Sequence, residues 1–178
     1  GDRLIMVREM SVSPQIGLGG SPMFVVRAKA SLENLTGEIL STEVTIRHAD
    51  GQPLHLTSQV PPYVPISERD GVIVYSWSVT LSEGIVADDL FATIPIDTIK
   101  NDNGSFPVVV RFKLRCAGMS AYMDAMTHFP NPDMATAQTI QMQGLKHNLV
   151  RTVQSAPNVS GMGKAPANFV STQEIQEF

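Results

Sequence analysis

Apolar and polar residues alternate with a period of two along the first two thirds of the chain. In residues 24–32 the even positions are mostly apolar, whereas Arg27 and Lys29 stand at odd positions. In residues 106–116 cations again separate apolar residues. Successive side chains of a strand point to opposite faces, so this pattern predicts half-buried strands and few helices.

Seven segments fit such strands, and turn residues separate them. They cover residues 4–12, 24–32, 40–48, 52–57, 72–81, 90–96 and 106–116. Asp50-Gly51 predicts a hairpin that joins 40–48 to 52–57, and Pro53 makes the second of these an edge strand. In residues 72–81, apolar residues on both faces near the start predict a central strand. The sequence predicts an antiparallel β-sandwich of the jelly-roll or immunoglobulin/C2-like type.

The composition of the 178-residue chain changes after Cys116. Residues 1–116 contain 23 charged residues, whereas residues 117–178 contain seven charged residues and six of the nine methionines. We therefore predict a sandwich body over 1–116 and a C-terminal arm of mixed or irregular structure over 117–178, with a helix start at Asn131-Pro132-Asp133. The arm is expected to pack on the body or on a neighbouring subunit, because methionine adapts well to contact surfaces.

Net charge and cysteine content limit the classes of partner and site. The formal charge of −4 argues against attraction of the whole molecule to nucleic acid or anionic membranes, but it leaves local basic patches open. One cysteine, Cys116, excludes an internal disulfide framework and is compatible with a reducing compartment, although the compartment itself is not predicted. No apolar run is long enough to span a membrane, and no leader sequence opens the chain.

Histidines and carboxylates give no compact catalytic or metal-binding motif. His48 and His55 are expected to face each other across the Asp50-Gly51 hairpin, which could hold a metal but more often makes a solvated surface. Acidic residues fall in predicted loops, where calcium binding or an acid/base pair competes with ordinary turn chemistry; they are Glu68, Asp70, Asp88, Asp89, Asp97 and Asp102, with Asn103. We therefore assign no catalytic residue, no metal and no cofactor.

Six of the thirteen basic residues stand at outward positions of the predicted strands. They are Arg27, Lys29, Arg47, Arg111, Lys113 and Arg115. If their strands are neighbours, they form a basic face that could bind the phosphate groups of lipid or nucleic acid. The alternative is that these charges only keep the strand faces soluble.

Two functions follow as hypotheses. The first is a non-enzymatic structural or protein–protein interaction module, a subunit of a larger, shell- or capsid-like assembly. Its partner would be another copy or another protein, bound through the methionines of the arm: Met119, Met123, Met126, Met134, Met142 and Met162. The alternative is a C2-like anion-binding module that uses the basic strand face. A hydrolase or lyase would require two of the loop carboxylates to meet His48 or His55.

Overall fold

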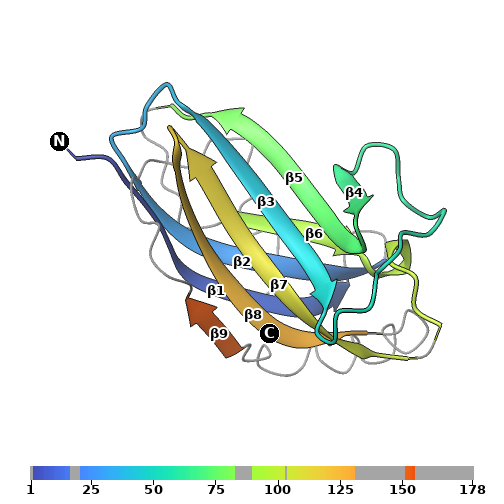
Figure 1. The fold of residues 1–178 in the computed structure, drawn as a ribbon. Coiled ribbons are helices and arrows are strands. Elements are labelled where there is room, and N and C mark those ends of the chain that lie inside the picture. Colours follow the sequence, from blue (N-terminus) through green and yellow to red (C-terminus); the bar gives the residue numbers. More distant parts are fainter. Residues whose placement is uncertain (1, 17–20, 83–89, 103, 131–150, 155–178) are drawn as a thin grey trace.

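The computed structural model describes residues 2–16, 21–82, 90–102 and 104–130, together with the backbone of 151–154 (Figure 1). Within these ranges the chain is mainly β, as the alternation predicts. The strands form two sheets in which all neighbouring strands are antiparallel.

The smaller sheet has the spatial order β1-β2-β6, and the larger has the order β4-β5-β3-β7-β8-β9. The smaller sheet is made of β1 (Leu4–Ile16), β2 (Pro22–Glu33) and β6 (Leu90–Pro95). The larger is made of β3 (Ile39–His48), β4 (Ile66–Arg69), β5 (Val72–Thr80), β7 (Phe106–Cys116), β8 (Met119–Phe129) and β9 (Arg151–Gln154). A short 3₁₀ helix, η2 (Ile96–Thr98), follows β6.

One hydrophobic core joins the two sheets. The smaller sheet contributes Val12, Phe24 and Val26, and the larger contributes Val44 and Phe112, all at most 1% exposed. Burying a side chain of this size stabilises the fold by about 1.5–3 kcal/mol. The architecture is therefore sandwich-like, with the alternate, mostly polar residues of each strand on the two outer faces.

Strand β5 follows the prediction for residues 72–81. Ile73 is buried in the core, and Tyr75 and Trp77 pack against it from the same face. On the other face Val74 is only 4% exposed. Strand β5 is therefore buried on both faces near its start, where it also has a strand on each edge, β3 and β4.

The predicted edge strand over residues 52–57 is wrong. Strand β3 pairs with β5 on one side and with β7 on the other, so no edge of β3 is available for a returning segment. Residues 52–57 instead form a loop, in which the N–H of Leu54 donates to the carbonyl of Gly71 at 2.8 Å and Leu56 makes one isolated bridge to Ile99. The short edge strand is β4, which the sequence analysis missed.

The chain after Cys116 continues the larger sheet. Strand β8 pairs with β7 from Phe106–Phe129 to Cys116–Met119, through a turn at Ala117-Gly118 with φ angles of 51° and 79°. The ring centroid of Phe129 lies 4.8 Å from that of Phe24 in the smaller sheet. The structure thus places residues 119–129 in the body, beyond the boundary predicted at Cys116.

The boundary was predicted at Cys116 because charged residues become rare there. Strand β8 carries few charges, but its apolar residues still alternate as in the earlier strands. The predicted helix start at 131–133 lies outside the described residues. The backbone of residues 151–154 forms β9, which pairs with β8 at the edge of the larger sheet.

Candidate anion-binding groove

The six predicted cations do not form one face. Arg27 and Lys29 lie on the outer face of β2 in the smaller sheet, where Lys29 pairs with Glu9 at 3.4 Å. The other four lie on the outer face of the larger sheet, on β3 and β7. They are Arg47, Arg111, Lys113 and Arg115. The two groups are on opposite sides of the core, so only the second can act together.

Arg111 is neutralised by its neighbour on β8. Its guanidinium donates two hydrogen bonds to Asp124, at 2.8 and 3.0 Å, and lies 4.0 Å above the ring centroid of Tyr122. The hydrogen bond to Asp124 raises the pKa of Arg111. A bidentate pair of this kind holds the guanidinium in place and leaves little of its charge for another anion.

Lys113 and Arg115 have no such partner. Among the described residues, no carboxylate lies within ion-pair distance of either side chain. Glu43 stands directly opposite Lys113 in the register of β3 and β7, but its carboxylate pairs with Arg69 at 3.5 Å. Two cations therefore remain uncompensated at one end of the larger sheet.

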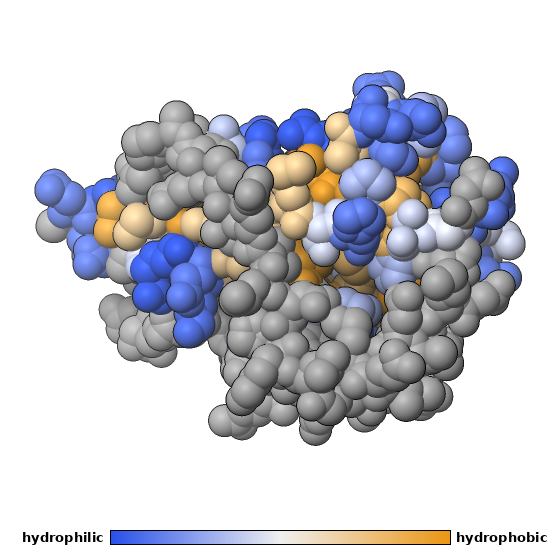
Figure 2. Space-filling view, turned by 90° about the horizontal axis from the view of Figure 1, so that it is seen from below, coloured by the Kyte–Doolittle hydropathy of each residue, from blue (hydrophilic) through white to orange (hydrophobic). Residues whose placement is uncertain are grey.

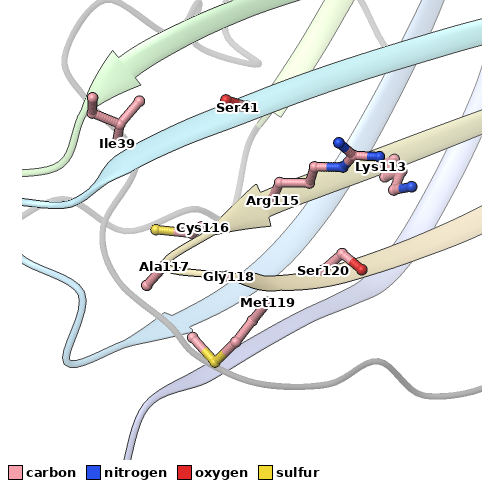
Figure 3. Close-up of a pocket in the computed structure, with 9 residues that line it drawn as sticks. All are labelled: Ile39, Ser41, Lys113, Arg115, Cys116, Ala117, Gly118, Met119 and Ser120. Atoms are coloured by element: carbon pink, nitrogen blue, oxygen red, sulfur yellow. The ribbon is translucent and has the colours of Figure 1, made fainter.

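These two cations line an open groove beside the turn between β7 and β8 (Figure 3). Its volume is about 480 Å³. Ser41 on β3 and Ser120 on β8 flank Arg115 in the register and also line the groove, as does Ile39, whose side chain is 61% exposed. The arrangement supplies two positive charges and two hydroxyl groups, the combination that recognises a phosphate or carboxylate group.

Cys116 borders the groove, but its thiol is buried. Its side chain is 2% exposed, and burial raises the pKa of its thiol, as does the nearby Glu38. In Figure 3 the sulfur points away from Lys113 and Arg115. A thiol of this kind stays protonated and inert, which agrees with its position in an inward-facing row.

The histidines do not form the predicted pair. His48 contacts Asp50 at 2.5 Å and stacks on Phe106, with ring centroids 5.1 Å apart. His55 contacts Glu68 at 3.1 Å, and the N–H of Leu56 donates to the same carboxylate at 2.9 Å. The cross-hairpin arrangement is wrong, because residues 52–57 leave β3 as a loop.

The acidic loops assemble no metal site within the described ranges. There, no group of three histidines, cysteines or carboxylates lies close enough to hold a metal ion. Asp102 contacts Lys100 at 3.7 Å, and Asp97 is exposed. Asp88, Asp89 and Asn103, which belong to the same prediction, lie outside the described residues.

The six predicted arm methionines have different environments. Met123 is buried in the core, Met119 packs against the core beside the groove, and Met126 is 48% exposed on the outer face. The other three, Met134, Met142 and Met162, lie outside the described residues. The three described methionines belong to strand β8, where Met119 and Met123 contact the core and Met126 is exposed on the outer face, so these three do not share one face.

Sequence reasoning found the cations but missed which of them are paired. The missing information was the hairpin at Ala117-Gly118, which sets Asp124 opposite Arg111 and Tyr122 opposite Lys113. The sequence did contain a signal for this hairpin, since buried and less buried side chains alternate in residues 119–129 as they do in 106–116.

The part of the chain that the structure describes contains no helix long and apolar enough to cross a membrane. No protein-family model matches this chain, and no similar protein was found among curated proteins or solved structures.

Proposed function

We propose that this chain is a non-enzymatic binding module that holds a phosphate-bearing ligand at the groove, with Lys113 and Arg115 as its ligands. The observation that carries the proposal is the contrast along β7. Arg111 is paired with a carboxylate, whereas the next two outward cations, Lys113 and Arg115, face an open groove with no carboxylate partner in the described part of the chain. We also propose that the two sheets form a sandwich of the C2 or jelly-roll type, and the binding role is argued from the groove and not from that fold.

The described chemistry favours binding over catalysis. The thiol of Cys116 is buried, and His48 and His55 each contact a different carboxylate of the local turn or loop. Lys113 and Arg115 supply positive charge and hydrogen-bond donors but no acceptor. The groove is therefore suited to hold an anion rather than to transform it.

The test is binding of three phosphate-bearing probes to the full chain at low salt. Inorganic pyrophosphate, vesicles of phosphatidylcholine with phosphatidylserine, and a single-stranded oligothymidylate distinguish a free phosphate, a lipid surface and a nucleic acid. We expect Lys113→Gln and Arg115→Gln each to weaken binding of the preferred probe by about 10- to 100-fold, since each removes one charge-assisted contact of about 1.5–3 kcal/mol.

Arg47→Gln is the matched control. Arg47 is on the outer face of the same sheet, but in the register of β3 it stands six residues from Ser41, which is about 20 Å along the strand. It should bind like the wild type. If none of the probes binds, or if Arg47→Gln weakens binding as much as the groove variants do, the groove is not the site.

A second candidate is the interaction module of a larger assembly predicted from the methionine-rich segment. The observation that favours it is the exposure of Met126, one of the predicted contact methionines, which is 48% exposed on the outer face of the larger sheet. Light scattering of the full chain over a range of concentrations tests it. A defined oligomer would support the assembly role, whereas a monomer at every concentration would contradict self-assembly.

A further inference from the structure

A second hydrophobic cluster lies on the outer face of the smaller sheet, away from the core and from the groove. It consists of Val25 on β2 and Phe91 on β6, which are 2% and 6% exposed, with Met23 packed against them. No apolar side chain from another described element joins this cluster. An outer sheet face of this kind is ordinarily polar and wet.

Polar residues of β1 beside the cluster are buried too. Ser13 and Gln15, which pair with Val25 and Met23 in the register of β1 and β2, are each 6% exposed. The Nε2 atom of Gln15 has no hydrogen-bond partner among the described residues. A buried amide donor without an acceptor is costly, so this atom points to an acceptor supplied by whatever covers the face.

The burial is confined to one end of the smaller sheet. At the other end of the same two strands, Glu9 and Lys29 form an exposed ion pair. The two ends therefore differ in character, and only the Gln15 end is suited to contact another segment. Seen from below, the described residues show hydrophobic groups between hydrophilic ones (Figure 2).

We propose that the outer face around Val25, Phe91 and Gln15 is a docking surface for the C-terminal segment of this chain, residues 155–178. This segment follows β9 directly, and β9 lies beside β1, the edge strand of the smaller sheet. Its 24 residues can extend over about 80 Å, whereas the three strands span only about 10 Å from β1 to β6.

The composition of the segment fits the surface. Residues 155–178 contain three charged side chains, Lys164, Glu174 and Glu177, and include Phe169-Val170 as an apolar pair. A backbone carbonyl of an extended segment is the acceptor that Gln15 Nε2 requires. The docking is independent of the anion groove, which belongs to the other sheet.

Hydrogen exchange of the full chain tests the docking surface. We expect amides within 155–178 to exchange on the order of tenfold or more slowly than in an unstructured peptide of the same sequence. Phe91→Asp should remove that protection. Gln15→Glu should do the same while keeping the shape of the side chain, because it replaces the donor with an acceptor. Tyr63→Asp, at a loop position that is 84% exposed, is the control and should leave the protection intact.

Three results would overturn the proposal. The first is free exchange of 155–178 in the wild type, and the second is protection that survives Gln15→Glu while β1 and β2 stay folded. The third is protection of β2 that rises with protein concentration together with a doubled mass in light scattering, which would make a second copy the occupant.

Discussion

Arg111, Lys113 and Arg115 occupy alternate positions of one strand, yet among the residues that the structure describes only Arg111 has a carboxylate partner. The difference comes from the neighbouring strands. Strand β8 offers Asp124 to Arg111 but Tyr122 and Ser120 to the other two, and β3 offers Lys113 a glutamate that contacts Arg69. Whether a cation of β7 has a carboxylate partner therefore depends on the register with the neighbouring strands. The sequence of one strand alone does not give that register.

Glu68 gives a prediction at this scale. The N–H of Leu56 and the ring of His55 hold the pKa of the Glu68 carboxyl below its usual value of 4.5. A lowered folded-state pKa stabilises the fold fully above pH 4.5 and loses that contribution as the pH falls through the folded-state value. The stability difference between the wild type and Glu68→Gln should therefore be largest at neutral pH and shrink below pH 4.5. Urea unfolding of both proteins at neutral pH and below pH 4.5 measures this stability difference. A difference that is the same at the two pH values would contradict the role of Glu68.

The elements were predicted better than their connections. Alternation located β1, β2, β3, β5, β6 and β7, because period two is a local property of the chain. The partner of each strand was not predictable, since pairing depends on segments far apart in the sequence. Strand β8 was missed for another reason: its low charge was taken as the mark of an arm, although Ala121, Met123 and Ala125 face the core in strict alternation.

The hairpin between β4 and β5 carries a prediction for Gly71. Its φ is +78°, and an added Cβ would lie 2.8 Å from the Cα and Cβ atoms of Pro53. Gly71→Ala should therefore lower the free energy of unfolding by about 2–4 kcal/mol, combining backbone strain with a clash. Gly51→Ala is the control, because its φ is +87° but nothing lies within 4 Å of its added Cβ. It should lose only about 1–2 kcal/mol. Equal losses in urea unfolding would show that the contact with Pro53 is unimportant.

Two methionines of β8 provide a further prediction. Met123 is 4% exposed in the core, whereas Met126 is 48% exposed on the outer face. Met123→Ala should lower the free energy of unfolding by about 2–5 kcal/mol, and Met126→Ala by less than about 0.5 kcal/mol. Thermal or urea unfolding distinguishes them. Similar small losses would mean that residues 119–129 are an arm after all.

At the scale of the whole molecule, the net charge is negative, but two cations, Lys113 and Arg115, make one groove locally positive. The formal charge of −4 gives no general attraction to anions, so the proposed binding would depend on the groove alone. Candidate site residues were predictable as a class, because cations alternate visibly along β7. The division of these cations between two sheets was not predictable. Arg27 and Lys29 lie in the smaller sheet because β2 pairs with β1 and β6, and this pairing is not visible in the sequence.

Salt dependence tests how many cations take part. With two contacts from Lys113 and Arg115, the logarithm of the binding constant for a single-stranded oligonucleotide should fall with the logarithm of salt concentration at a slope of about −1.4. All four cations of the larger sheet acting together would give a slope of about −2.8. A slope near −2.8 would show that all four cations form one broad basic binding face, which would contradict a site confined to the groove. Fluorescence titration at several salt concentrations measures it.

The late position of β8 in the chain has a consequence for synthesis. Strand β7 leaves the ribosome before β8, and at about 5–20 residues per second its outer edge stays open for roughly one to three seconds. Hairpin closure itself takes only about 1–10 μs once β8 has emerged. During that interval Arg111, Lys113 and Arg115 give β7 a positive charge. This charge repels β7 of other nascent chains, whose edge is also still unpaired. The residues proposed to bind phosphate would therefore also protect the unfinished sheet from aggregation.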